Sequence, residues 1–184
     1  MTTEQIKAMQ STLGITADGF WGPKSIAACQ KHLRSLMPTP HPWPDTYEMR
    51  LQNFYGFAGD ESHLVNLPVE GVEYNGKPVK TIRCHIKVAA SLGRILAAMR
   101  ETFPEILKGY AGCFNDRPMR GGTLPSLHAR GAAIDLCPGD NSNLSPWPHK
   151  AAMPLAVMEI FAREGWLPAG AFWGRDAMHF QATR

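Results

Sequence analysis

The chain has 184 residues, of which 44% are hydrophobic and 19% are charged. These values are ordinary for a folded globular protein, so they exclude a disordered or fibrous chain, and the length allows one domain with a small appendage. The formal net charge is +3, and the lysines and arginines are scattered instead of gathered in basic runs. The charge therefore gives no reason to expect binding to nucleic acid.

Neither a basic start followed by an apolar run nor a stretch of about 18 uncharged apolar residues occurs in the sequence. We therefore expect a soluble product made without a signal peptide and without insertion into a membrane. The four cysteines are widely spaced and form no CxxC pair, which favours free buried thiols over a structural zinc knuckle. They are Cys29, Cys84, Cys113 and Cys137.

The first 36 residues predict a small helical hairpin. Ile6, Met9 and Leu13 share one face of a helix over 3–13, and a second helix runs from 22–25 to about residue 36. Asp18-Gly19 marks a tight turn between them, and Pro23 is acceptable in the first turn of the second helix because no helical partner needs its missing N–H.

This hairpin resembles the repeat of bacterial peptidoglycan-binding domains. The matching residues are Met9-Gln10, Leu13-Gly14, Asp18-Gly19-Phe20-Trp21-Gly22 and Ser25-Ile26-Ala27-Ala28. The resemblance implies that residues 1–36 bind peptidoglycan, with Trp21 as a contact residue. The alternative is that Phe20 and Trp21 only fill a small core. A modest positive charge also suits an anionic polymer such as the bacterial cell wall.

Residues 37–45 read Met-Pro-Thr-Pro-His-Pro-Trp-Pro-Asp. Alternate prolines stiffen a chain toward polyproline II and remove amide donors, so this segment is predicted to be a linker. Asp45 is predicted to cap a helix that continues to about Tyr55. The domain that follows is then 46–184.

The rest of the chain mixes helices and strands without regular alternation, which favours the α+β class over a doubly wound sheet. The helix over 87–103 has the clearest apolar stripe and should cover a sheet. Strands are predicted over 64–69, 71–74, 78–86, 110–115, 132–137 and 178–182, and a further helix over 153–164.

Two histidines and two aspartates suggest a metal site. His128 and Asp135 lie in one short stretch, and Asp176 and His179 lie near the C-terminus. Zinc takes neutral imidazole and carboxylate ligands, and a catalytic site uses three protein ligands and leaves one position to water. His128, Asp135 and His179 are candidates for the three ligands, and Asp176 is a spare carboxylate able to act on the water.

Each of these residues also has a simpler interpretation. His128 taken singly fits a hydrogen-bonded histidine, and Asp176 fits a residue that caps a turn. Asp135 lies within an apolar run, where an unpaired carboxylate is costly, so a cation or a donor must meet it.

The spacing SxHxxGxAxD over 126–135, followed by DxMHF over 176–180, resembles a family of zinc metallopeptidases. The family includes VanY-type D-Ala-D-Ala carboxypeptidases and the L-alanyl-D-glutamate endopeptidases of phage endolysins. The resemblance covers about 47–181 and implies a Hedgehog/DD-peptidase-like antiparallel sheet flanked by helices. It also implies that His128, Asp135 and His179 bind Zn²⁺ and that Asp176 is the general acid and base.

Members of that family use an arginine upstream of the SxH motif to hold a substrate carbonyl or carboxylate. Arg117 and Arg120 both occupy suitable positions, and Arg117 is the preferred one. A guanidinium offers a planar fork to an anionic peptide or to a developing oxyanion. A solvated loop arginine is the alternative for each. The hydroxyl of Ser126 is a candidate for bonding either the backbone or the substrate.

The sequence thus predicts a modular peptidoglycan hydrolase of the endolysin type, expected to be a monomer that acts on the bacterial wall after its release. An L-alanyl-D-glutamate endopeptidase is the preferred activity, and a D-Ala-D-Ala carboxypeptidase is the alternative. A wall-binding protein that keeps a zinc site without turnover is a rival of another class. The spare carboxylate of Asp176 disfavours that rival, because a purely structural zinc site is closed.

Overall fold

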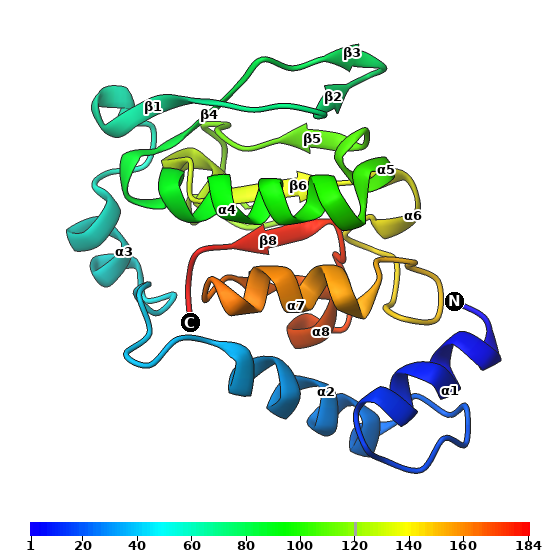
Figure 1. Cartoon of the computed structure of the whole chain (residues 1–184). Coiled ribbons are helices and arrows are strands. Elements are labelled where there is room, and N and C mark those ends of the chain that lie inside the picture. Colours follow the sequence, from blue (N-terminus) through cyan, green and yellow to red (C-terminus); the bar gives the residue numbers. More distant parts are fainter. Residues whose placement is uncertain (120) are drawn as a thin grey trace.

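The computed structural model describes residues 1–119 and 121–184 and has an α+β architecture (Figure 1). Its α-helices are α1 Thr3–Thr12, α2 Pro23–Leu36, α3 Glu48–Tyr55, α4 Ile86–Thr102, α5 Pro104–Leu107, α6 Pro138–Asn141, α7 Leu155–Arg163 and α8 Ala169–Trp173. Short 3-10 helices are η1 Glu61–His63 and η2 Leu127–Arg130. The strands are β1 Leu64–Pro68, β2 Glu73–Tyr74, β3 Lys77–Pro78, β4 Thr81–His85, β5 Tyr110–Gly112, β6 Ala133–Leu136, β7 Leu167–Pro168 and β8 His179–Gln181.

The central sheet has the strand order β5-β6-β8-β7, and all its neighbours are antiparallel. Two further antiparallel pairs, β1-β4 and β2-β3, lie beyond β5 (Figure 1). The expected antiparallel sheet is therefore present. The strands predicted over 71–74 and 78–86 meet in the hairpin β2-β3, whose turn residues Asn75 and Gly76 both have positive φ. The strand predicted over 78–86 is divided between β3 and β4.

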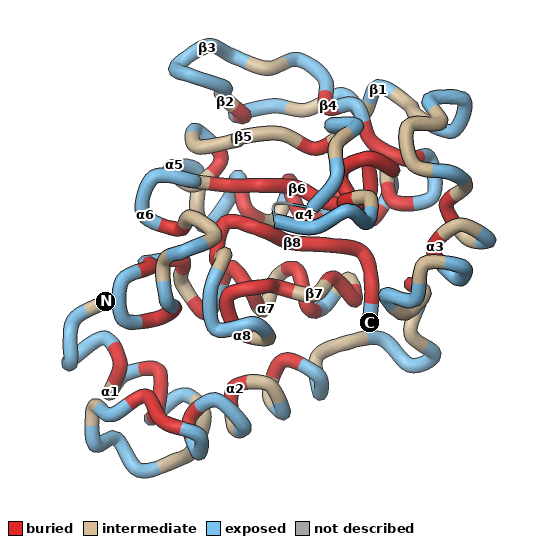
Figure 2. Tube along the Cα trace, turned by 180° about the vertical axis from the view of Figure 1, so that it is seen from behind, coloured by how far each residue is buried: buried red, intermediate tan, exposed pale blue. Residues whose placement is uncertain are grey.

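The two faces of the central sheet differ because successive side chains of a strand point to opposite sides. On one face Ile134 of β6 is paired with Phe180 of β8, and the Phe180 ring stacks on Phe161 of α7 at a centroid distance of 3.8 Å. The next pair in the register, Asp135 and His179, therefore lies on the opposite face. Figure 2 shows from behind that β6 and β8 are buried along their length.

Helix α4 confirms the amphipathic helix predicted over 87–103. Its buried stripe of Val88, Leu92, Ile95, Leu96 and Met99 packs in the core, and the helix crosses the face of the sheet that also carries α7 (Figure 1). The indole Nε1 of Trp166, which follows α7, donates to the Ser91 hydroxyl on α4 at 2.9 Å, so the two covering helices are joined by a buried hydrogen bond.

The N-terminal hairpin is confirmed as α1 and α2, and the Gln10 side chain fixes the turn between them. The Gln10 amide donates to the Asp18 carboxylate at 2.8 Å and to the Phe20 carbonyl at 3.0 Å. Helix α2 packs against α7, where His32 Nε2 lies 2.8 Å from Glu159 Oε1. The hairpin therefore shares one hydrophobic core with the rest of the chain.

Trp21 lies in that shared core. Only 5% of its surface is exposed, and its ring meets Trp147 edge to face at 5.3 Å. The indole predicted to contact peptidoglycan thus has no face open to a polymer in this structure, whereas its neighbour Phe20 is 69% exposed.

The proline segment 37–45 is irregular, as predicted, but its second half is anchored to distant parts of the chain. Trp43 is buried in its middle, and its indole donates to the Glu164 carbonyl at 2.9 Å. Asp45 accepts from the Tyr47 backbone N–H at 3.1 Å, so its capping bond falls before α3, which begins at Glu48 and not at Asp45. The segment is therefore packed against the rest of the chain at Trp43.

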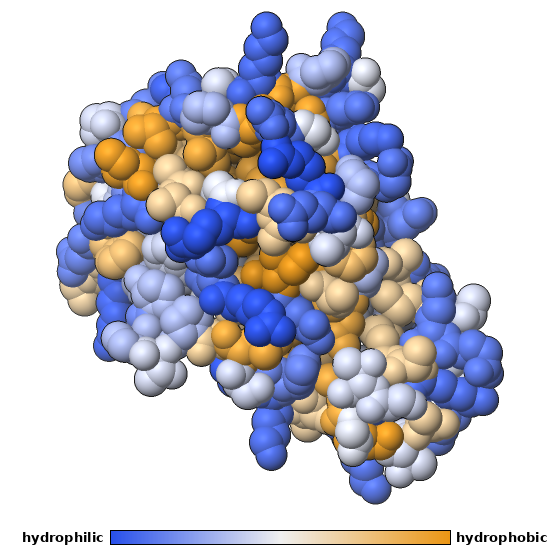
Figure 3. All heavy atoms as spheres, in the orientation of Figure 1, coloured by the Kyte–Doolittle hydropathy of each residue, from blue (hydrophilic) through white to orange (hydrophobic). Residues whose placement is uncertain are grey.

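Hydrophobic and hydrophilic residues are interspersed over the face of the molecule seen in Figure 3. Within residues 1–119 and 121–184, no helix has both the length and the apolar character needed to cross a bilayer.

Candidate metal centre

The first ligand candidate, His128, is carried by η2, and the local sequence explains its position. Ser126 precedes η2, and its hydroxyl accepts from the His128 backbone N–H at 3.3 Å. Ser126 is therefore an N-cap residue. Gly131 ends η2 at a φ of 63°, in the left-handed region that glycine adopts at no steric cost.

Gly131 is also required by close packing. Its carbonyl accepts from the His85 N–H at 2.9 Å, and a Cβ on Gly131 would lie 2.8 Å from that same nitrogen. The glycine in the SxHxxGxAxD spacing thus permits the end of η2 to lie directly against the end of β4.

The three predicted ligands converge. His128 Nε2 lies 3.2 Å from Asp135 Oδ1 and 3.1 Å from His179 Nδ1, and the last two atoms are 3.0 Å apart. Ligand atoms of these three residues form a compact group able to hold a metal ion. All three residues are buried. Asp135 and His179 come from register partners on adjacent strands, so the sheet itself sets their separation.

The outer nitrogen of each histidine is held by an acceptor. His128 Nδ1 lies 2.7 Å from the Cys113 carbonyl, and His179 Nε2 lies 3.0 Å from Gln181 Oε1. The Gln181 amide donates to the Thr183 hydroxyl at 2.6 Å, which orients its oxygen toward His179. Since each neutral imidazole carries its proton on the outer nitrogen, both inner nitrogens present lone pairs toward the Asp135 carboxylate oxygen.

Three lone-pair acceptors facing one another require a cation or a proton between them. In a tetrahedral site with bonds of about 2.0–2.1 Å, two ligand atoms lie roughly 3.3–3.4 Å apart. The observed separations of 3.0–3.2 Å are close to that spacing. Two imidazoles and one carboxylate therefore fit zinc in type, number and spacing.

The charges in the cluster support each other. Burial alone would raise the pKa of the Asp135 carboxyl, but hydrogen bonds and charge from His128 and His179 hold that pKa well below its usual value. For His179, burial disfavours the charged ring, yet the hydrogen bond and charge of Asp135, with a further contribution from Asp176, raise its pKa. Asp135 is thus an anion that attracts a positive charge, either a proton or a metal ion.

Asp176 lies on the wall of the cavity that contains the three ligands. This cavity has a volume of about 420 Å³. Asp176 has a φ of 59°, and its carbonyl accepts from the His179 N–H at 2.9 Å, so it forms a tight turn into β8. That turn brings the carboxylate to the same side of the sheet as the ligand side chains.

Of the two arginine candidates, only Arg117 lies within the described residues. Arg117 lines the metal cavity, and its guanidinium donates to the Pro118 carbonyl at 3.2 Å. Arg120 lies outside the described residues. Ser126 also lines the cavity, although its hydroxyl is engaged with the backbone of His128.

Several residues of this cavity were missed from the sequence. The Trp173 ring stacks on the His179 ring at 5.5 Å, with an interplanar angle of 24°. Arg175 adds a second described arginine to the wall, next to Asp176. The Gly174-Arg175 step directly before Asp176 was the available signal, because it places a cation beside the candidate general acid.

The buried Arg130 connects η2 to both ends of α3. Its Nε donates to the Gly56 carbonyl at 3.0 Å, and its Nη2 pairs with Glu48 at the start of α3. This pair joins the loop that carries His128 to a helix far away in the sequence. It therefore positions the metal centre without lining the cavity.

Comparison with known proteins supports a peptidase. Residues 120–182 match the model of a family described as D-alanyl-D-alanine carboxypeptidase. The match spans about a third of the chain and includes the three clustered ligands and Asp176. No curated protein and no solved structure matches the chain. The family match and the metal-binding geometry thus fall on the same residues.

Proposed function

We propose that this protein is a zinc-dependent peptidase that hydrolyses an amide bond in the stem peptide of bacterial peptidoglycan. The observation that carries the proposal is that two imidazoles and one carboxylate converge on a single point in a cavity. Each imidazole is held by an acceptor at the nitrogen that faces away from this point. His128, Asp135 and His179 would hold the ion. A bound zinc ion supplies Lewis acidity and lowers the pKa of water.

Asp176 has the position of the general base and acid. A carboxylate oxygen of Asp176 accepts a proton from the attacking water and returns it to the amine nitrogen that leaves. Its place on the tight turn before β8 keeps it beside the ligands without using it as one. This spare carboxylate favours turnover over a purely structural metal site.

The two arginines that line the cavity in the described part of the chain suit the charge of the substrate. In both candidate bonds, the residue that contributes the amide nitrogen carries an α-carboxylate: that of terminal D-alanine, or that of D-glutamate linked through its side chain. Arg117 and Arg175 line the cavity and offer forked donors for this carboxylate and for the developing oxyanion. We retain Arg117 as the first choice and add Arg175.

Two observations bear on which bond is cut. The N-terminal hairpin resembles peptidoglycan-binding repeats, and this favours an endolysin that cleaves the L-alanyl-D-glutamate bond. The description of the matching family names D-alanyl-D-alanine carboxypeptidase, and this favours removal of a terminal D-alanine. We propose the endopeptidase first and the carboxypeptidase second.

Mass spectrometry of purified muropeptides treated with the zinc-loaded full chain tests both. Separation of the peptide from its L-alanine is the expected result, and loss of a single terminal alanine would replace the endopeptidase by the carboxypeptidase. Asp176→Asn should be inactive, while Asp140→Asn, an exposed carboxylate outside the cavity lining, should cleave normally. Stoichiometric zinc binding without cleavage of any muropeptide would instead support a non-catalytic wall-binding protein.

A further inference from the structure

A second cavity, of about 580 Å³, adjoins the metal cavity. It lies between the end of α2, the proline segment and α8. Its lining residues are Arg34, Met37, Pro38, Thr39, His41, Leu167, Phe172, Trp173 and Arg184. The N-terminal hairpin and the segment after it thus form one wall of a hollow whose other wall belongs to the sheet domain.

The aromatic end of α8 joins the two cavities. Trp173 lines both of them, and its ring is the one that stacks on the ligand candidate His179. The neighbouring Phe172 lines the second cavity only. The second cavity therefore lies within reach of a chain that is bound at the ligand cluster and extends past Trp173.

Arg34 gives this cavity its charge. Its guanidinium carbon lies 4.8 Å from the centroid of the Phe172 ring, a cation–π contact that leaves the N–H donors at its edge free for a planar partner. Among the described residues no carboxylate pairs with Arg34, and the lining of the cavity contains no acidic side chain. Arg34 is therefore an oriented cation without an internal counter-charge.

The nearby charges do not neutralise it. Asp45 pairs with Arg50 at 2.5 Å and lies 3.9 Å from Arg184, so one aspartate serves two other arginines. Because Arg184 already has Asp45 as a partner, Arg34 is the cation on which the site depends. The Nε2 atom of His41 is buried and has no hydrogen-bond partner within the described part of the chain. It adds a polar atom without a protein partner on the same wall.

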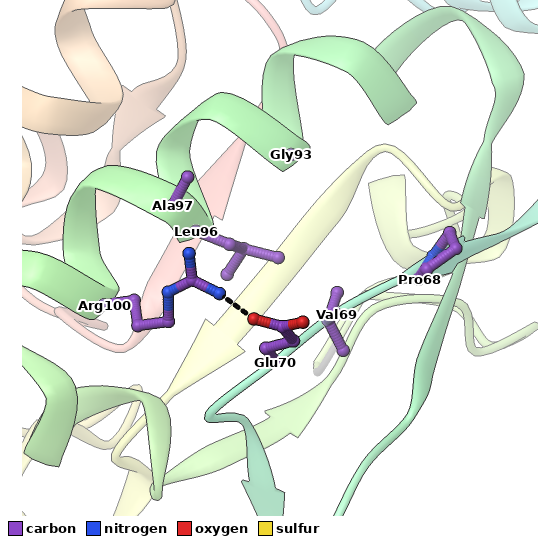
Figure 4. A pocket seen from close by; sticks show the side chains of 7 residues that line it. All are labelled: Pro68, Val69, Glu70, Gly93, Leu96, Ala97 and Arg100. Carbon is purple, nitrogen blue, oxygen red and sulfur yellow. Dashed lines mark hydrogen bonds and ion pairs between the residues drawn. The ribbon is translucent and has the colours of Figure 1, made fainter.

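Another arginine-lined cavity shows the opposite arrangement (Figure 4). There Arg100 of α4 points across the cavity toward Glu70, and the two side chains form an ion pair. That cavity has no lining residue in common with the metal cavity. Arg100 is satisfied within the protein and so provides a matched control for Arg34.

We propose that the cavity between α2, the proline segment and α8 is a second substrate subsite, in which Arg34 binds a carboxylate of the stem peptide remote from the bond that is cut. The inference rests on the proposed function for the identity of the substrate. It assigns the N-terminal hairpin a role in forming the substrate groove, in addition to any anchoring to the wall. A carboxylate is favoured because the planar guanidinium, held over the Phe172 ring, offers a fork of donors that matches two oxygens.

The test measures binding and cleavage of synthetic stem peptides by the zinc-loaded full chain. The peptides carry either free carboxylates or carboxamides at each position remote from the cleaved bond, one at a time. We expect one amidation to weaken binding of the unaltered protein about tenfold, the size of a lost charge-assisted hydrogen bond. Arg34→Gln should bind the peptide with free carboxylates about tenfold more weakly than the unaltered protein does. This variant should also bind the free and the amidated peptide equally well. Arg34→Lys should recover part of the preference.

The control Arg100→Gln removes one positive charge from the other cavity. It should keep the full tenfold preference for the peptide with the free carboxylate. Equal binding of free and amidated peptides by the unaltered protein would overturn the subsite, and so would an equal loss in Arg34→Gln with both peptides. Competition by the disaccharide without its peptide would overturn it in favour of a sugar site. If no peptide is cleaved, the proposed function fails, while calorimetric binding still decides the subsite separately.

Discussion

The two faces of the β6-β8 pair compare directly, because the same two strands build both. On one face Ile134 and Phe180 pack under α7, and on the other Asp135 and His179 join His128. One step along the register separates a hydrophobic contact from a candidate metal-binding contact. The hydrophobic contacts on the core face hold the two strands in register. That register in turn sets the separation between Asp135 and His179.

The largest expected effect is on the metal face. His128→Ala should lower peptidase activity by more than about 10³-fold, because two ligands hold zinc poorly. The fold should be retained, since the strands are stabilised from the other face. Activity and circular dichroism measured together check this, with the exposed His149→Ala as control. Full activity of His128→Ala would end the assignment of the site.

The core face should show the reverse. Phe180→Ala removes a fully buried ring stacked on Phe161 and should lower the free energy of unfolding by about 3–5 kcal/mol. Urea denaturation measures the change. Phe57→Ala, at a ring that is 68% exposed, should cost less than about 0.5 kcal/mol. A small loss in Phe180→Ala would show that the core face does not hold the strands.

Arg130 connects η2, which carries His128, to the start and the end of α3. Arg130→Met removes a buried guanidinium that bonds Gly56 and Glu48, and should lower the free energy of unfolding by about 2–4 kcal/mol. Zinc affinity should fall with it because η2 carries His128. If thermal unfolding is unchanged and only activity falls, then Arg130 acts on the substrate and not as a brace.

The outer hydrogen bonds of the ligands should have a smaller effect. Gln181→Leu removes the acceptor that orients His179 and should weaken zinc binding by about 10–100-fold, with unfolding little changed. Competition with a chromophoric chelator measures this affinity. Unaltered affinity would mean that the register alone orients the ring.

The pH dependence has a definite sign. Asp135 raises the pKa of His179, so in the metal-free protein this pair stabilises the fold below the unfolded pKa of histidine, and the stabilisation is lost as the pH rises through the higher folded pKa. Zinc needs the neutral ring, so zinc affinity should rise with pH, by up to about tenfold per unit for each proton displaced. Thermal shifts with and without zinc at several pH values check both trends.

The sequence predicted the helices with long apolar stripes and the central strands. It missed α5, α6 and α8, because four or five residues are too few to show a helical period. The proline segment was predicted as a linker from composition, yet Trp43 within it anchors the segment to Glu164. An aromatic residue among prolines was the signal that this segment packs.

The ligand set was predicted because the resemblance rests on side chains whose types the chemistry requires. Trp173 and Arg175 were missed because they act through position on the cavity wall, which only the fold determines. The Cys113 carbonyl could not be predicted either, since any residue supplies a carbonyl and only the backbone path brings it to His128.

X-ray absorption of the zinc-loaded full chain tests the central claim most directly. We expect one zinc per chain with only nitrogen and oxygen neighbours at about 2.0–2.2 Å and the scattering of two imidazoles. His179→Ala should lose one imidazole or the metal altogether. A sulfur neighbour at about 2.3 Å, or stoichiometric zinc with an unchanged spectrum in His179→Ala, would contradict it.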